Sequence, residues 1–200
     1  MIGALLLAVT LHANVLVSAG HEGRPQSCAR FPHRACNLGA RGERAWTPVV
    51  ANEITRELRA AGLRVLREPA DFRGTYDVDA AVIIHFDGGD PVCTSGASIG
   101  YPPGTSSRFA RLWRRLYAPV IPFRMMPDDF TSGLREYYAY RQIHARDGVL
   151  VLELGEVTCP RQHAWLAPRL DAIADLIAYA IARITGEGHV PIPAKFAIDR

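Results

Sequence analysis

The 200-residue sequence lacks a long apolar run, a C-x-x-C pair, an internal repeat and a linker-like segment. Without a C-x-x-C pair, a structural zinc site built from cysteines is poorly supported. No apolar stretch reaches the length of a transmembrane helix, so we expect no membrane insertion of the mature protein. Because nothing divides the chain, we expect one folded domain over residues 14–186 and an irregular tail over 187–200.

Charge of either sign is modest. Charged residues make up 22% of the chain, the net charge is +3, and hydrophobic residues make up 48%, which is enough for a core and excludes wholesale disorder. The densest basic group has the spacing of one helix face and consists of Arg108, Arg111, Arg114 and Arg115. This spacing indicates a solvated helix face, so we expect no nucleic-acid partner.

Residues 1–13 resemble a secretory signal peptide. Ile2 to Thr10 form an apolar run, and Ala13 is a candidate cleavage position. No Lys or Arg precedes the run, and Leu11 stands where a small residue is usual, so a buried first strand is the alternative. The signal-peptide interpretation predicts a periplasmic or secreted protein.

The four cysteines are Cys28, Cys36, Cys93 and Cys159. An even number in an exported protein predicts disulfides, although the sequence leaves the pairing open. One arrangement closes a short loop between Cys28 and Cys36 and leaves Cys93 with Cys159. Buried free thiols are the alternative.

Apolar patterns alternate between strands and helices. The expected strands are 14–19, 63–66, 80–84 and 148–154. The expected helices run from Thr47 and Pro48 to Gly62, from Ser106 or Ser107 to about Tyr117, and from Leu170 to Ile184 before Gly186. Residues 22–42 and 87–104 read as loops, and 118–147 have no clear pattern. This alternation predicts an α/β fold: a mostly parallel twisted sheet flanked by helices on both faces.

Three polar residues follow or end expected strands: His21, His85 and Glu153. Sites in such folds form at the carboxyl ends of parallel strands, so these side chains are expected to meet. Each histidine alone has an ordinary explanation: His21 is typical of a turn residue, and His85 of a core histidine with satisfied hydrogen bonds. Glu153 is more informative, because a carboxylate inside an apolar strand is costly to bury without a partner.

Two histidines and a carboxylate are a standard ligand set for catalytic zinc, which activates water and polarises a carbonyl. Glu43 supplies such a carboxylate just ahead of a helix, although by itself it reads as an ordinary exposed glutamate. Glu153 has the chemistry of a proton carrier if its apolar surroundings raise its pKa.

Four motifs, in order along the chain, resemble those of the zinc-dependent N-acetylmuramoyl-L-alanine amidases called amidase type 3. Residues 18–23, Ser-Ala-Gly-His-Glu-Gly, are similar to Asp-Pro-Gly-His-Gly-Gly. The second motif is a glutamate ahead of a helix that ends in Ala-Gly, as at Glu43 and 61–62. Residues 79–87 resemble Asp-Leu-x-Ile-Ser-Ile-His-Ala-Asn, and residues 149–156 resemble Val-Leu-Val-Glu-Leu-Gly-Phe.

This resemblance implies that His21, Glu43 and His85 bind Zn²⁺ and that Glu153 is the catalytic carboxylate. It implies hydrolysis of the amide bond between N-acetylmuramic acid and L-alanine, with peptidoglycan or its fragments as the partner. The alternatives are a zinc hydrolase of another peptide or amide on the same fold, and a catalytically silent cell-wall-binding domain.

The sequence departs from the family pattern around the proposed metal ligands. Ser-Ala at 18–19 replaces Asp-Pro, Glu22 replaces a glycine, Asp87 replaces an asparagine and Glu156 replaces an aromatic residue. None of these changes removes a proposed ligand. Glu22 and Asp87 are expected to add negative charge near the metal, which bears on the substrate.

Overall fold

The computed structural model describes residues 11–12, 14–24, 37–72, 74–105 and 108–194. The elements in these ranges, in chain order, are β1 (Leu11–His12), β2 (Val15–Ala19), α1 (Glu43–Ala60), β3 (Val65–Glu68), β4 (Tyr76–Asp87), β5 (Ser98–Gly100), α2 (Arg108–Tyr117), α3 (Ser132–Arg135), the 3₁₀ helix η3 (Tyr138–Arg141), β6 (Ile143–Glu156), α4 (Pro160–Leu166), the 3₁₀ helix η4 (Ala167–Arg169) and α5 (Leu170–Thr185).

The strands form one mostly parallel sheet. Its order is β3-β2-β4-β6-β5, and the short β1 pairs with β4 beside this path. The neighbours β3, β2, β4 and β6 run parallel, while β5 is antiparallel to β6 at the edge. The α/β prediction with a single, mostly parallel sheet is therefore confirmed.

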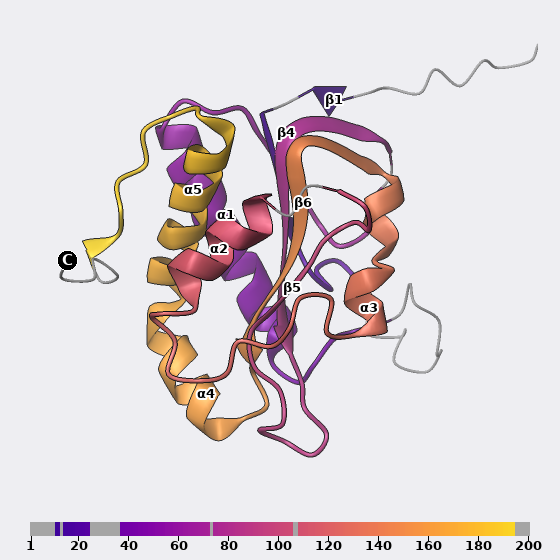
Figure 1. Cartoon of the computed structure of the whole chain (residues 1–200), viewed down its shortest axis with the longest axis vertical. Coiled ribbons are helices and arrows are strands. Elements are labelled where there is room, and N and C mark those ends of the chain that lie inside the picture. Colours follow the sequence, from indigo (N-terminus) through magenta and orange to yellow (C-terminus); the bar gives the residue numbers. More distant parts are fainter. Residues whose placement is uncertain (1–10, 13, 25–36, 73, 106–107, 195–200) are drawn as a thin grey trace, which may run out of the picture.

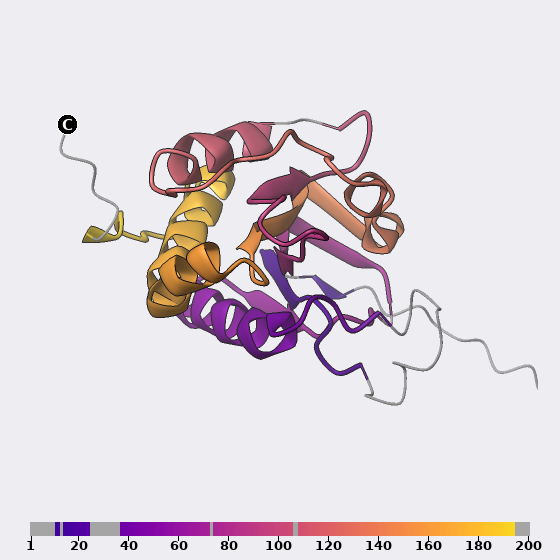
Figure 2. The same cartoon turned by 90° about the horizontal axis from the view of Figure 1, so that it is seen from below.

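Helices cover the two faces of the sheet unequally. In Figure 1, α1, α2, α4 and α5 lie on one side of the sheet and α3 lies on the other, and Figure 2 shows the same separation from below. The larger core cluster contains residues of α1, α2, α4 and α5, whereas the smaller one contains Leu134 of α3 and Ala139 of η3. Short helices therefore cover the second face.

The middle parts of the central strands are mostly apolar because both of their faces are covered. In β4, Val82 and Ile84 belong to the larger core, and Ile83 belongs to the smaller one. Side chains alternate along a strand, so His85 faces the side that carries α3. His85 pairs in register with Glu153 of β6, which places both polar side chains side by side on that face.

Several predicted boundaries agree with the structure. The strand predicted at 14–19 is β2, and those predicted at 80–84 and 148–154 are the middles of the longer β4 and β6. The last helix, α5, ends before Gly186, whose φ of 73° gives the left-handed cap that glycine favours.

The predicted start of the first helix at Thr47 and Pro48 is wrong. Helix α1 begins at Glu43, and Pro48 lies inside it. The hydroxyl of Thr47 is not a cap; it donates a hydrogen bond to the carbonyl of Gly20 at 2.7 Å and ties the helix to the end of β2. A tertiary contact has thus overridden a local start signal, and it brings Glu43 to the end of the sheet.

Two predicted irregular regions contain regular structure. Strand β5 lies within the predicted loop 87–104, and residues 118–147, which the pattern left unassigned, contain α3, η3 and the start of β6. Among the described helices, none has the length and apolar character needed to cross a membrane. The signal-peptide prediction falls almost entirely on residues outside the described ranges.

A disulfide joins Cys93 to Cys159 and confirms one of the two predicted pairs. Cys28 and Cys36 lie outside the described residues. Next to the bridge, the fully buried carboxylate of Glu156 accepts hydrogen bonds from the backbone N–H groups of Cys93 (2.5 Å) and Ser95 (2.8 Å). The departure at Glu156 therefore helps to hold the loop before β5 against the end of β6.

Replacing Cys93 and Cys159 together with alanine should lower the free energy of unfolding. The bridge spans 66 residues of sequence, and closing a loop of that size in the unfolded chain contributes about 4 kcal/mol. Urea denaturation with and without reductant measures the effect. Reductant should lower the midpoint of the original protein and shift that of the double variant less; equal midpoints for the oxidised protein and the double variant would contradict the stabilising role.

Candidate metal centre

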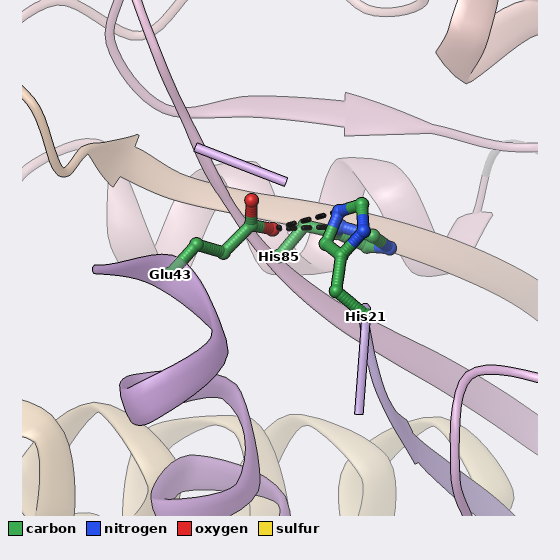
Figure 3. A group of neighbouring side chains, drawn as sticks. All are labelled: His21, Glu43 and His85. Carbon is green, nitrogen blue, oxygen red and sulfur yellow. Dashed lines mark hydrogen bonds and ion pairs between the residues drawn. The ribbon is translucent and has the colours of Figure 1, made fainter. Parts of the chain in front are cut away.

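Three predicted ligands from separate segments converge at the carboxyl end of the sheet. His21 follows β2, Glu43 is the first residue of α1, and His85 lies near the end of β4. All three are buried, and their ligating atoms lie within 4.8 Å of one another. Figure 3 shows both imidazole rings directed at the Glu43 carboxylate.

One carboxylate oxygen lies between the two histidines. Oε1 of Glu43 is 2.9 Å from Nδ1 of His85 and 3.4 Å from Nε2 of His21 (Figure 3). The two rings stand edge to face, with centroids 4.8 Å apart. Two nitrogens and one oxygen thus point at a common space, which is the donor set of catalytic zinc sites.

Close packing leaves room only for glycine at two positions around these ligands. A Cβ at Gly20 would lie 2.3 Å from Cε1 of the His85 ring, and one at Gly39 would lie 2.2 Å from Oε2 of Glu43. His21 itself has a φ of 61°, a left-handed backbone conformation that residues other than glycine seldom adopt. The local backbone is therefore shaped around the three side chains, which is typical of a functional site.

The outer nitrogen of each histidine has its own partner. Nδ1 of His21 lies 2.7 Å from the carbonyl oxygen of Asn37, which can only accept a hydrogen bond. His21 therefore carries its proton on Nδ1 and keeps the Nε2 lone pair toward the centre. Nε2 of His85 lies 3.0 Å from the hydroxyl of Tyr137, an arrangement that leaves Nδ1 to face the centre. Partners of this kind orient the histidine ligands of metal sites.

The protonation states also suit a metal ligand set. Burial, reinforced by the neighbouring His85, lowers the pKa of His21 and favours the neutral imidazole. Burial acts to raise the pKa of Glu43, but the hydrogen bond and charge of His85, the charge of His21 and the N–H of Phe86 outweigh it and lower that pKa. A neutral histidine and an ionised carboxylate are the forms that bind a cation.

Glu153 lies beside this group with an unsatisfied oxygen. Its Oε2 atom is buried and has no hydrogen-bond partner within the described part of the chain. Burial raises the pKa of Glu153 well above its usual range, and the charges of Glu43 and Asp87 raise it further. An orphaned carboxylate with a raised pKa, next to a candidate metal site, is a candidate proton carrier.

His21, His85 and Glu153 line one cavity of about 390 Å³, and Glu43 lies behind the two histidines. Its other walls come mainly from residues 131–138, in and around α3, and from Arg24 and Asn37. Tyr137 and Tyr138 pack against the smaller core and also line this cavity. Local sequence patterns do not mark Asn37, Tyr137 or Arg24 as site residues, because their roles depend on contacts with distant segments.

The expected extra negative charge near the ligands is partly offset. Glu22 forms an ion pair with Arg67 at 2.8 Å, which balances its charge. Asp87 accepts a hydrogen bond from the hydroxyl of Ser95 and contributes to the raised pKa of Glu153. Of the two substitutions, Asp87 is therefore the one that acts on the site.

Sequence similarity does not identify the family of this chain. No protein-family model matches it. No curated protein matches it either.

Solved structures, in contrast, match it over most of its length. The catalytic domain of CwlV, an N-acetylmuramoyl-L-alanine amidase from Bacillus (Paenibacillus) polymyxa var. colistinus, has a TM-score of 0.61 and 17% identity over 86% of this chain and 98% of its own. The amidase Ami1 from Mycobacterium smegmatis has a TM-score of 0.60 and 19% identity over 86% and 96% of the two chains. AmiC2 of Nostoc punctiforme, another such amidase, has a TM-score of 0.59 and 17% identity over 86% and 93%. The chain therefore has the fold of N-acetylmuramoyl-L-alanine amidases, as its four motifs predicted.

Proposed function

We propose that this protein is a zinc-dependent N-acetylmuramoyl-L-alanine amidase. It would hydrolyse the amide bond between N-acetylmuramic acid and the L-alanine of the stem peptide in peptidoglycan. The observation that carries the proposal is that His21, Glu43 and His85 converge at one point, and that both histidines line the same cavity as Glu153, whose Oε2 has no partner among the described residues. The fold shared with amidases and the four ordered motifs support it.

The donor set fits zinc better than it fits calcium or magnesium. Two imidazole nitrogens and one carboxylate oxygen suit zinc, whereas calcium and magnesium prefer ligands that are all oxygen. In this arrangement Nε2 of His21, Oε1 of Glu43 and Nδ1 of His85 would hold the ion. When bound, zinc would supply a Lewis acid that activates water and polarises the scissile carbonyl.

The chain's own residues would orient the ligands and move the proton. The carbonyl of Asn37 accepts from Nδ1 of His21 and so directs the Nε2 lone pair inward, while the hydroxyl of Tyr137 holds the ring of His85 with Nδ1 toward the centre. Glu153 would take a proton from the attacking water and deliver it to the leaving amine, since its raised pKa makes it a stronger base than an ordinary carboxylate. A silent domain would have no evident need for this unpartnered buried oxygen.

The direct test is release of stem peptides from purified peptidoglycan, with and without a chelator. We expect chelator-sensitive release of peptides that carry a free L-alanine amine, identified by mass spectrometry. Chelator-sensitive cleavage of a different bond would indicate another amide substrate. No release from zinc-loaded protein would count against the amidase activity, and absence of zinc binding as well would favour a silent wall-binding domain.

Glu153→Gln and His85→Ala should separate catalysis from metal binding. Glu153→Gln keeps the size of the side chain but cannot carry the proton, so zinc should remain and turnover should fall by at least about 100-fold. His85→Ala removes a ligand and should lose stoichiometric zinc. Elemental analysis and the release assay measure the two effects. An active Gln variant would disprove the role of Glu153, and full zinc occupancy in the Ala variant would disprove the ligand set.

Tyr137→Phe should weaken zinc binding without removing a ligand. The substitution deletes the hydroxyl 3.0 Å from Nε2 of His85 and leaves the aromatic packing in place. Loss of such a partner typically lowers metal affinity about 10- to 100-fold. Competition with a chromophoric chelator measures the affinity, and Tyr140→Phe, whose hydroxyl bonds to the carbonyl of Leu134, is the matched control. Equal affinities in both variants would show that Tyr137 does not orient His85.

We also propose that the protein is exported to the periplasm or the medium. The Cys93–Cys159 disulfide supports this location, because such bonds persist in oxidising compartments. Cell fractionation and mass analysis of the mature N-terminus test it. Export with loss of about the first 13 residues is expected; intact protein retained in the cytoplasm would contradict the proposal.

A further inference from the structure

Arg24 is a buried arginine in the cavity wall next to the proposed ligand His21. Its side chain is 6% exposed, and its Nη1 atom lies 3.4 Å from Nδ1 of His21. The same atom donates a hydrogen bond to the carbonyl of Asn37 at 2.7 Å. The positive charge therefore lies one imidazole ring away from Nε2, the nitrogen that faces the metal centre. Burying such a charge is costly unless it is paired with an opposite charge and hydrogen-bonded.

The carboxylate paired with Arg24 balances this charge only weakly. Nε of Arg24 lies 3.3 Å from Oδ1 of Asp71, whose side chain is 55% exposed. A long contact to a solvated carboxylate contributes little, because water screens it. An anionic group that entered the cavity would meet a guanidinium whose charge is incompletely compensated.

The guanidinium is held in place before any ligand arrives. Its Cζ atom lies 5.9 Å from the centroid of the Tyr138 ring, and the Tyr138 hydroxyl donates a hydrogen bond to the carbonyl of Ala70. Arg44 donates a hydrogen bond to the backbone carbonyl of Arg24 at 2.9 Å. An arginine fixed in this way loses little conformational freedom on binding, which favours affinity and selectivity.

Arg24 also supplies the positive charge of the cavity wall. It is the sole Lys or Arg among the described residues that line the cavity, whose acidic lining residues are Glu136 and Glu153. Glu136 is exposed, whereas Arg24 lies deep beside the metal ligands. The planar guanidinium suits a carboxylate, which it can bind through two parallel hydrogen bonds.

We propose that Arg24 binds a carboxylate of the substrate, close to the bond that is cut. The identity of this carboxylate rests on the proposed function. In a stem peptide the residue after L-alanine is D-glutamate, whose α-carboxyl group is a few bonds from the scissile amide and is either free or amidated. Arg24 therefore selects stem peptides in which this carboxylate is free, and disfavours the amidated form.

The test measures binding of two ligands that differ in one group. The probes are N-acetylmuramoyl-L-alanyl-D-glutamate and its α-amide, N-acetylmuramoyl-L-alanyl-D-isoglutamine, titrated calorimetrically into zinc-loaded Glu153→Gln protein, in which cleavage is blocked. We expect this protein to prefer the free carboxylate about 10- to 100-fold, the range expected of a charged hydrogen bond. Adding the Arg24→Gln substitution should abolish that preference. Equal affinities before Arg24 is changed, or an unaltered preference afterwards, would overturn the proposal.

Asp71→Asn is the matched control. The substitution removes the charge of Asp71, the exposed partner of Arg24 in their ion pair, and leaves Arg24 in place. The preference should persist or increase, and its loss to the level of the Arg24 variant would overturn the proposal. Zinc content is measured in each protein, since Arg24 also contacts Asn37. If Arg24→Gln loses zinc, Arg24→Lys replaces it: the charge remains without the planar fork, so the preference should fall, and an unchanged preference would contradict the proposal.

Binding and cleavage fail separately in this design. If the preference and its dependence on Arg24 are observed but zinc-loaded protein with Glu153 intact cleaves neither compound nor peptidoglycan, the carboxylate site stands and the amidase activity fails. If peptidoglycan is cleaved and neither ligand is preferred, the activity stands and the role of Arg24 fails.

Discussion

The carboxylate of Glu43, shared between His21 and His85, is the contact on which the site depends. It joins the end of β2, the start of α1 and the end of β4 at one point. Each group is costly to bury alone, so the three must lie together or be stabilised by a cation. The backbone N–H groups of Ala40 and Phe86 also donate to Glu43, which fixes the carboxylate relative to both the loop and the sheet.

Unequal cover of the sheet creates the space in front of these residues. Long helices fill the face that carries α1 and α5, whereas the opposite face is covered by the short α3 and by η3. Strand alternation sends His85 and Glu153 toward this thinner side, where the cavity lies. The alternation of side chains along β4 and β6 thus determines which polar side chains reach the site.

The residues around the proposed ligands act on the site in different ways. The Asn37 carbonyl and the Tyr137 hydroxyl control which nitrogen of each histidine faces inward. Asp87 acts through charge, because it helps to raise the pKa of Glu153. Arg24 lies beside His21 and offers a fixed positive charge to an incoming group. Proposed metal binding, proton transfer and substrate selection are therefore arranged around one cavity but rest on separate residues.

Local signals in the sequence predicted the parts of the fold that depend on neighbouring residues. The apolar runs predicted β2, β4 and β6, and the glycine at 186 predicted the end of α5, because burial on both faces and a left-handed cap leave direct traces in sequence. The helix start at Thr47 was wrong, since the Thr47 hydroxyl bonds to Gly20 instead of capping the helix. Strand β5 was missed, because three residues carry little periodic signal.

By itself, the sequence determined the α/β class, the order of the strands along the chain and the presence of His21, His85 and Glu153 at or near strand ends. Those features follow from residue periodicity, and the ordered motifs added Glu43. The tertiary structure alone decided that the three candidate ligands share one space, which ring nitrogen of each histidine faces it, and that Arg24 and Tyr137 line the neighbouring cavity. These contacts join segments far apart in the chain, and their geometry is set by packing, which local sequence patterns do not encode.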